Sequence, residues 1–351
     1  MARRNLPIPK PRKKTPAAGH AAHAAHAAHA GHAGRAAHAG HAVAIGLSAA
    51  IVSITGEQPT VLVVHRDRGR DALPFGTFDP VGHRTLELGL RNWVREQTRL
   101  QLGYVEQLYT FGDRGRHLTD PGEGPRVLSV GYLALTRTEA APDTLWREWY
   151  GYFPWEDWRL AKPPIIGTAI LPGLATFSAA APDRQVRQRR NDRIRLCFGI
   201  GSAGWDEEKV LERYELLYEA GLIAEAQHDR GTVPSAGFPK LGRDMVFDHR
   251  RILATAMGRL RGKMKYRPIV FELMRPEFTL LELQRTVEAI SGVRLHKQNF
   301  RRLVETQGIV EKTGRLTHKT GGRPAKKFRF RREILRERPA PGLRPTGPRN
   351  R

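Results

Sequence analysis

Polar and basic side chains of types that contact nucleic-acid bases and phosphates are concentrated between residues 296 and 327. Asn and Gln can form paired hydrogen bonds with adenine, whereas Arg and Lys contact guanine edges or the phosphate backbone. On an arbitrary basic helix such charges usually form a solvated face, so the surrounding elements must decide between the two interpretations. The candidate DNA contacts are His296, Lys297, Gln298, Asn299, Arg301, Arg302, Lys319, Arg323, Lys326 and Lys327.

A capped helix is predicted immediately before these side chains. Thr279 is suitable as its N-cap residue, and Glu282 lies three residues later, where it would complete a capping box. Gly292 is suitable as the C-terminal stop. Apolar side chains recur between the two ends at helical spacing and would form one buried stripe: Leu280, Leu283, Val287 and Ile290.

A second helix and a basic hairpin follow this first helix. The second helix is predicted over residues 295–305, where Phe300, Leu303 and Val304 would be buried beneath the candidate DNA contacts. Residues 309–330 fit two strands joined by a flexible basic loop with two glycines, which can lie along a minor groove or a phosphate backbone. Helix, turn, helix and basic hairpin in this order predict a winged helix-turn-helix that binds duplex DNA.

The charge of the whole chain agrees with a polyanionic partner. The 351 residues carry a formal net charge of +24, with an isoelectric point near 10.9, although charge alone does not separate DNA, RNA and anionic membranes. From Arg294 onward there are 18 Lys or Arg residues against four Glu, so a net charge of +14 lies in this last part. Cys197 is the single cysteine, and no apolar run is long enough to span a bilayer. We therefore expect a cytoplasmic protein without disulfides, a cysteine-based zinc site or a membrane partner.

The two ends of the chain are predicted to be disordered. Residues 1–42 form a basic and His/Ala-rich tail without an apolar face to bury. Its regularly spaced histidines, such as His20 and His23, would bind a transition metal only weakly, and a repeat-expanded tail explains them better. Residues 336–351 are predicted to form a second basic tail.

Folded structure is predicted to begin at Val43. Residues 44–54 and 60–65 are apolar, β-branched runs separated by turn residues, which is typical of paired strands. Residues 84–100 carry apolar side chains at helical intervals, and further strands are predicted within residues 100–113 and 126–137. The order strand, strand, helix, strand, strand indicates an α/β or α+β domain of about a hundred residues.

Several segments follow, in order, the pattern of one known family. They include VEQLYTFGD at residues 105–113, VLSVGYLAL at 127–135, and residues 247–273. With these segments and the winged-helix sequence that ends in GGRPAKKFRF, the chain resembles the Nudix-related transcriptional regulators of NAD metabolism, the NrtR type. The resemblance implies an α+β fold in which a Nudix-like α/β/α sandwich is followed by a C-terminal winged helix-turn-helix. The implied parts are a sensor at 43–246 with an aromatic and helical extension, a coupling helix region at 247–272, and a winged helix at 273–335.

The resemblance also implies a function. It predicts a regulator of NAD-metabolism genes, a repressor or an activator, that binds operator DNA and responds to a nucleotide effector, such as ADP-ribose or NAD, held by the Nudix-like domain. No cofactor is required in this interpretation. A homodimer would present two recognition helices to half-sites about one DNA turn apart, so we expect a palindromic operator.

The Nudix-like part lacks most of the carboxylates that its catalytic relatives need. An active Nudix box has the pattern GX5EX7REUXEEXGU, in which glutamates on one helix face hold divalent cations against a diphosphate. We therefore expect no catalytic residues, no metal site and a pocket that only binds. Aligned on the end of the predicted helix, the box arginine, its three following glutamates and the glycine fall on Asn92, Trp93, Glu96, Gln97 and Arg99.

An anionic nucleotide would require phosphate-binding cations and a ring that stacks on its base. A glycine would let the backbone approach the ligand, although each such residue has an ordinary structural explanation, with the glycine in a turn and the phenylalanines in the core. The candidate effector-binding residues are Gly76, Phe78, Arg95, Arg99, Phe111, Arg114 and Arg116.

The region between the sandwich and the coupling region is predicted in outline. Aromatic residues crowd into 146–158 and are expected to pack in the core or at a dimer interface, with a nucleic-acid stacking surface as the alternative. Residues 184–195 are strongly basic and are either a solvated helix or a second phosphate contact. Residues 205–226 predict an amphipathic helix capped by Asp206, and 247–265 predict the coupling helix.

Two alternative functions remain open at this point. The first is an active Nudix hydrolase that cleaves a nucleoside diphosphate derivative and carries an accessory nucleic-acid-binding domain. An alignment on Gly82 and Gly103 gives the correct box length for it, but this alignment places Leu88 at the first glutamate and restores no metal cluster. The second is an RNA-binding accessory protein, which rests only on the charge and the aromatic density.

Overall fold

The computed structural model describes residues 43–65, 69–113, 126–137, 145–233, 237–317, 324–337 and 340–343. Contacts divide the chain into residues 1–41 and 42–351, and the second unit holds every element described below. Four predicted site residues and the N-terminal tail at 1–42 lie outside the described residues. The four are Arg114, Arg116, Lys319 and Arg323.

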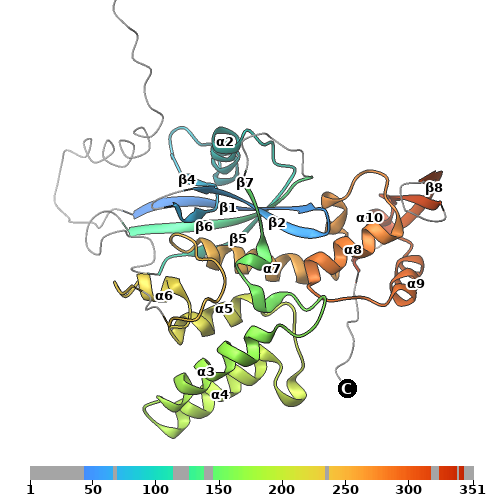
Figure 1. Cartoon of the computed structure of the whole chain (residues 1–351). Helices are drawn as coiled ribbons and strands as arrows, with labels where there is room; N and C mark the ends of the chain where they lie inside the picture. Colours follow the sequence, from blue (N-terminus) through green and yellow to red (C-terminus); the bar gives the residue numbers. More distant parts are fainter. Residues whose placement is uncertain are drawn as a thin grey trace, which may run out of the picture. The chain divides into compact units, whose positions relative to one another are not determined.

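A mixed sheet forms the centre of the first part of this unit (Figure 1). Its main path runs β3-β2-β1-β6-β5, with β4 paired to β1 and β7 paired to β2. β1 and β6 pair in parallel, and the other pairs among the described strands are antiparallel. The strands are β1 (Val43–Thr55), β2 (Gln58–His65), β3 (Asp71–Ala72), β4 (Phe75–Thr77), β5 (Tyr104–Phe111), β6 (Arg126–Leu135) and β7 (Leu145–Glu148).

Both faces of this sheet are covered, and the sequence of β1 shows why. Side chains alternate between the two faces of a strand. Ala50 and Val52 accordingly point into one hydrophobic cluster, and Ala49 and Ile51 into the other. Helix α2 (Leu86–Thr98) packs on the second cluster, and the first lies against α7 (His249–Met264), so the predicted α/β/α sandwich is confirmed (Figure 1).

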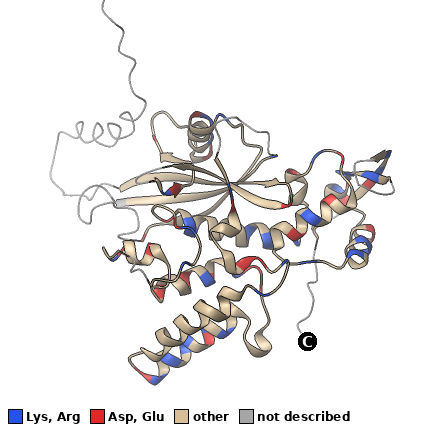
Figure 2. Cartoon of the chain, in the orientation of Figure 1, with Lys and Arg blue, Asp and Glu red and all other residues tan. Residues whose placement is uncertain are grey.

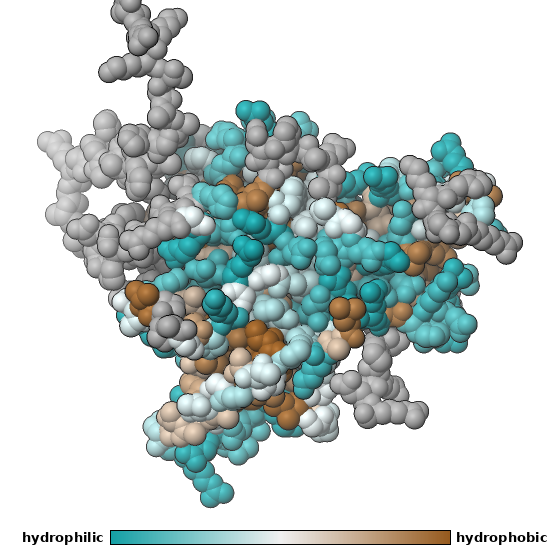
Figure 3. Space-filling view, in the orientation of Figure 1, coloured by the Kyte–Doolittle hydropathy of each residue, from teal (hydrophilic) through white to brown (hydrophobic). Residues whose placement is uncertain are grey.

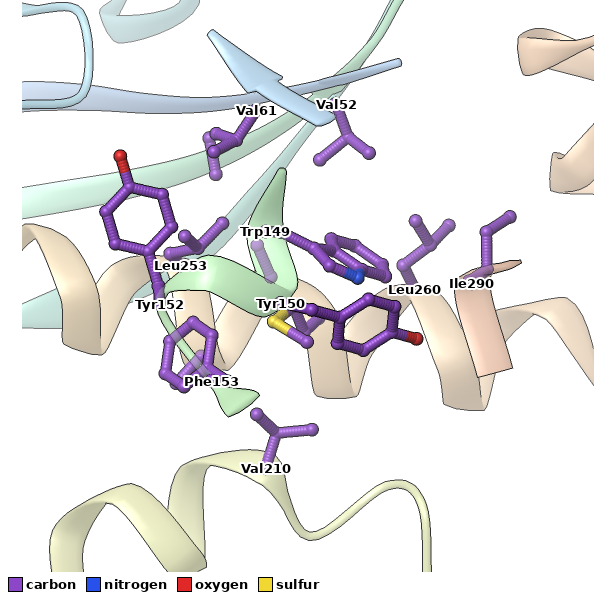
Figure 4. Close-up of a cluster of buried hydrophobic side chains, with 14 of the residues drawn as sticks. Val52, Val61, Trp149, Tyr150, Tyr152, Phe153, Val210, Leu253, Leu260 and Ile290 are labelled. Carbon is purple, nitrogen blue, oxygen red and sulfur yellow. The ribbon is translucent and has the colours of Figure 1, made fainter. Parts of the chain in front are cut away.

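The aromatic segment after β7 is core. It forms the short 3₁₀ turns η3 (Trp149–Gly151) and η4 (Pro154–Glu156), and its rings point between the sheet, α7 and α5 (Figure 4). This confirms the core interpretation over an exposed stacking surface. Four of its side chains have no exposed surface: Trp149, Tyr152, Phe153 and Trp155.

A helical extension follows, and one prediction for it was wrong. The single helix expected over 205–226 is two helices, because the first ends at Glu219 and Gly221 then takes a φ of +70°. Asp206 also caps no helix, since its carboxylate accepts from the Glu208 amide in the preceding turn. The elements are η5 (Ile166–Ile170), α3 (Leu171–Ala179), α4 (Arg184–Phe198), η6 (Gly201–Ala203), α5 (Val210–Glu219) and α6 (Ala224–His228).

The C-terminal part is a winged helix-turn-helix, as predicted. The capping box of Thr279 and Glu282 is formed in full, and Gly292 ends the first helix with a φ of +76°. The predicted tail from residue 336 begins too early, because Leu343 is buried and donates from its amide to the Met264 carbonyl. The elements are η7 (Ile269–Leu273), α8 (Leu280–Ser291), α9 (Lys297–Gln307), β8 (Val310–Thr317), β9 (Ala325–Phe330) and α10 (Ile334–Glu337). Among the described residues, no helix is long and apolar enough to cross a membrane.

Candidate nucleic-acid interface

Helix α9 presents its predicted DNA contacts to solvent and its apolar side to the core. Phe300 and Val304 are buried and anchor the helix, whereas the residues between them on the outer side are exposed. Figure 2 shows Lys and Arg along α9, and Figure 3 shows this part of the surface as hydrophilic. All six candidates at this helix are exposed: His296, Lys297, Gln298, Asn299, Arg301 and Arg302.

The basic hairpin is held against the start of α8. The Phe278 and Phe328 backbones exchange two hydrogen bonds, of 2.9 and 2.7 Å, so β9 is fixed beside the segment that leads into α8. Lys326 is exposed and Lys327 is half-buried on β9. Of the four candidate cations on the wing, these two are therefore placed on β9, beside the segment that leads into α8, and the other two lie outside the described residues.

A buried polar group sets the turn between α8 and α9. The Glu288 carboxylate is 3% exposed and accepts from the Leu295 amide, the Gln284 side chain and the Arg294 guanidinium, each at 2.9 Å. The Gln284 amide also donates to the Leu295 carbonyl. Sequence reasoning missed both Gln284 and Glu288, because on a helical pattern they look like two more solvated polar residues.

The C-terminal end of α8 is bound to the sandwich. The last carbonyls of a helix have no partner within that helix, and here three of them accept from the first part of the unit. Tyr150 Oη donates to the Ala289 carbonyl at 2.7 Å, Arg261 Nε to Ile290 at 2.9 Å, and the Trp158 amide to Gly292 at 2.7 Å. The winged helix is therefore hydrogen-bonded to α7 and to the aromatic segment.

A buried ion cluster lies at the same junction. Glu156 of η4 accepts from Arg213 of α5 at 2.6 and 2.9 Å and from Arg261 of α7 at 2.7 Å, and all three side chains are fully buried. Burial raises the pKa of this carboxyl, but the two guanidinium groups more than offset that effect and hold its pKa below the ordinary value. The cluster thus stays ionised and links three elements.

On the opposite face of the sheet, the positions of the eroded Nudix box hold strand β4. The Gln97 side chain exchanges two hydrogen bonds with the Phe75 backbone, at 3.2 and 2.5 Å. Trp93 Nε1 donates to the Thr77 carbonyl at 2.9 Å, and its ring lies so close over Gly76 that an added Cβ would overlap it. Trp93 and Gln97, at two positions where a Nudix box would carry glutamates, therefore hold β4 against α2. The Trp93 ring also explains why a residue without a Cβ occupies position 76.

The other predicted effector residues differ in accessibility. Phe78 is half-buried beside His83, and Arg95 and Arg99 are exposed on and just after the last turn of α2. Phe111 is 1% exposed and lies under the Arg251 guanidinium, 5.2 Å from its carbon. The ring of Phe111 is therefore a core side chain and cannot stack on a base, which corrects that part of the prediction. Among the described residues, no three His, Cys, Asp or Glu side chains are grouped so as to hold a metal ion.

Comparison with known proteins finds a family match for the C-terminal part. The family model of the NrtR DNA-binding winged helix domain matches residues 270–330. This part of the chain is therefore similar to the NrtR winged helix. The ADPR responsive transcriptional repressor NtrR of Acinetobacter baylyi is 42% identical over 87 residues, which are 25% of this chain and 34% of that protein. The chain thus matches about a third of the length of this curated relative.

Two solved structures are also similar to this chain. Shewanella oneidensis NrtR, complexed with a 27mer DNA, is 20% identical and is matched over 83% of this chain and 95% of its own, with a TM-score of 0.47. A MutT/nudix family protein from Enterococcus faecalis is 15% identical, with coverages of 89% and 93% and a TM-score of 0.44. These sequence identities and TM-scores are too low to support an argument about function. The proposed function therefore rests on the match to the winged-helix model and on the geometry of the chain itself.

Proposed function

We propose that this chain is a nucleotide-responsive transcriptional regulator of the NrtR type. Its winged helix binds duplex DNA, with α9 in the major groove and the wing against the phosphate backbone. The observation that carries the proposal is the exposed polar face of α9, at Lys297–Gln307, within the segment that matches the NrtR DNA-binding model.

The sandwich is proposed to be the sensor. The curated relative is named an ADPR responsive transcriptional repressor, which supports repression controlled by ADP-ribose. We extend this to a cytoplasmic homodimer that binds a palindromic operator at NAD-metabolism genes. In this proposal residues 43–246 bind the effector and residues 273–335 bind DNA. Residues 247–272 transmit the influence of the effector from the first part to the second.

The Nudix-like pocket is proposed to bind without cleaving. Trp93 and Gln97, at two positions of box glutamates, hold β4 and leave Glu96 as the remaining carboxylate of the three. Incubation with ADP-ribose and magnesium separates this proposal from the hydrolase alternative. Release of AMP at a rate proportional to protein concentration would favour the hydrolase.

Asn299→Ala and Gln298→Ala are each expected to weaken binding to the operator by about 1–3 kcal/mol, because an amide side chain in the major groove discriminates between bases. Both side chains are exposed on the first turn of α9. The affinity for random duplex is expected to change little. Fluorescence anisotropy on both DNAs at one salt concentration measures the difference, with Thr306→Ala, exposed on the last turn of the same helix, as the control.

Lys326→Ala is expected to weaken all duplexes similarly and to lower the slope of log affinity against log salt by about one, since it removes one phosphate contact. Lys326 is exposed on β9, in the wing. Affinity measured from low to moderate salt gives the slope. Equal losses on operator and random DNA for all three variants would contradict the assigned docking of α9.

ADP-ribose is expected to change operator affinity at fixed salt, because an effector that binds one orientation of the winged helices better must shift their equilibrium. Arg95→Ala with Arg99→Ala should reduce that response, since these exposed cations lie at the end of α2. Operator titrations with and without ADP-ribose, NAD or AMP measure it. An operator affinity that none of these nucleotides alters would overturn the sensor proposal and leave DNA binding intact.

A further inference from the structure

A cavity of about 810 Å³ lies where the sandwich meets the winged helix. Its lining residues come from the start of β5, from the segment just after β6, and from β9 and α10. The end of α7, the η7 turn and the segment between η7 and α8 contribute the others. This volume is within the range of cavities that hold small-molecule ligands, and none of the residues predicted for the effector lines it.

The charge of the lining residues is strongly positive. Six of them are basic and one, Glu272, is acidic. Two of the six have carboxylate partners: Lys263 pairs with Glu106 at 2.7 Å, and Arg329 pairs with Glu311. Within the part of the chain that the structure describes, no ion pair is formed by the other four: Arg137, Arg267, Arg275 and Arg332.

These four arginines are exposed cations around one space. Gathering like charges costs free energy, which an anion between them would recover. Guanidinium groups also match the geometry of phosphate oxygens and can bind them in pairs of hydrogen bonds. The rim of the cavity is therefore suited to one or more phosphate groups.

The inner wall of the cavity is apolar and aromatic. Phe330 stacks on Phe271 with ring centroids 4.5 Å apart, and Phe271 lies 5.5 Å from Phe278. Phe271, Phe278 and Ile269 are buried, so the accessible apolar surface of this wall comes from the half-buried Phe330 and from Leu335, which is 50% exposed. An apolar wall beside a cationic rim fits a ligand that has a flat ring system at one end and phosphate at the other.

We propose that this cavity is a nucleotide-binding site, separate from the face of α2. The phosphates lie against Arg267, Arg275 and Arg332, and the base lies against Phe330 and Leu335. Since Tyr104 and Lys263 belong to the sandwich and Arg332 follows the wing, a bound nucleotide connects the two parts. Its effect on operator binding rests on the proposed function, whereas the binding itself does not.

Calorimetric titration of the full chain with AMP tests the site, with adenosine and inorganic phosphate as separate probes. AMP is expected to bind about tenfold or more tightly than either fragment, since only AMP uses both the rim and the wall. Arg275→Ala with Arg332→Ala should weaken AMP binding by about tenfold or more. The matched control is Arg184→Ala with Arg189→Ala, which removes two exposed arginines from α4 and should leave AMP binding unchanged.

A second pair of variants separates the two possible nucleotide sites. Arg95→Ala with Arg99→Ala alters the face of α2 and should leave AMP binding at the junction intact. Absence of AMP binding to the wild-type chain would overturn the proposal, and so would AMP binding that keeps its full affinity and stoichiometry in the Arg275/Arg332 variant. If that variant instead loses affinity for every duplex while AMP binding is unchanged, the arginines contact the DNA backbone and the proposal is also wrong.

Operator affinity measured with and without AMP then isolates the regulatory consequence. AMP binding that depends on Arg275 and Arg332, with an operator affinity that does not respond to AMP, would support the site and contradict its regulatory role. If the wild-type chain binds AMP at the junction but does not bind the operator at all, the proposed function is contradicted and the nucleotide site is still supported.

Discussion

Glu156→Gln is expected to lower the free energy of unfolding by about 3–5 kcal/mol, the usual effect of removing one charge from a buried ion cluster. The substitution keeps the shape of the side chain but removes the carboxylate that pairs with Arg213 and Arg261, two cations with no exposed surface. Because Arg261 also donates to the Ile290 carbonyl, the loss should loosen α7 and α8 together.

The destabilisation caused by Glu156→Gln should become smaller as the pH falls. The folded-state pKa of Glu156 lies below the ordinary value of 4.5, so its stabilising contribution is fully present above that value. This contribution is lost as pH falls through the folded-state pKa, where the wild-type carboxyl also becomes neutral. The difference between the variant and the wild-type chain should therefore be largest near neutral pH and should shrink in acid.

Glu219→Gln provides the control for this prediction. Glu219 pairs with Arg193 at 2.5 Å, but both side chains are nearly half exposed, and surface pairs contribute about 0–1 kcal/mol. Urea unfolding of both variants at two pH values compares them. Equal losses for Glu156→Gln and Glu219→Gln would show that the buried cluster does not stabilise the fold.

The parts of the fold that were predicted well are those with local signals. Thr279, Glu282 and Gly292 fix the ends of α8 within one short segment, and the structure places the helix between them. The apolar run that contains Ala49, Ala50, Ile51 and Val52 marks β1 in the same way, because it depends only on neighbouring residues.

The parts that were missed depend on residues far apart in the sequence. Glu156 lies 57 positions from Arg213 and 105 from Arg261, so no spacing rule connects them. Phe111 follows the strand pattern of β5, but only the packing of α7, through Arg251, shows that its ring is covered. The sequence therefore could not predict which polar or aromatic side chains are buried by an element far away in the chain.

Part of the candidate site shows the same limit. The exposure of Asn299 and the burial of Phe300 follow from helical periodicity and were predicted. The cavity at the junction was not predicted, because its arginines come from the segment after β6, from the two segments that flank η7, and from the wing and its end. A set of cations that converges only in the folded chain looks, in the sequence, like a general excess of positive charge.

Gly292→Ala is expected to destabilise the chain by about 2–5 kcal/mol. Gly292 has a φ of +76°, in which an alanine costs about 1–2 kcal/mol. An added Cβ would also overlap the Glu156 carbonyl oxygen, and relieving such overpacking costs about 1–3 kcal/mol more. The second cost exists only while α8 is docked on the aromatic segment.

Gly308→Ala isolates the first cost from the second. Gly308 ends α9 with a φ of +59°, in the same left-handed conformation, but an added Cβ there would meet no atom within 4 Å. Its expected loss is about 1–2 kcal/mol. Urea unfolding of both variants gives the difference, which measures how tightly the end of α8 is held against the sandwich.

The same pair of glycines tests how a signal reaches the DNA. If the docked junction transmits the effector's influence, Gly292→Ala should reduce the response of operator affinity to ADP-ribose, whereas Gly308→Ala should preserve it. Reduced coupling with unchanged affinity for random duplex would place the defect at the contact of Gly292 with Trp158 and Glu156. Equal losses of stability for the two variants would mean that this contact is not maintained in solution, and coupling would then have to pass through the linker between α7 and α8 instead.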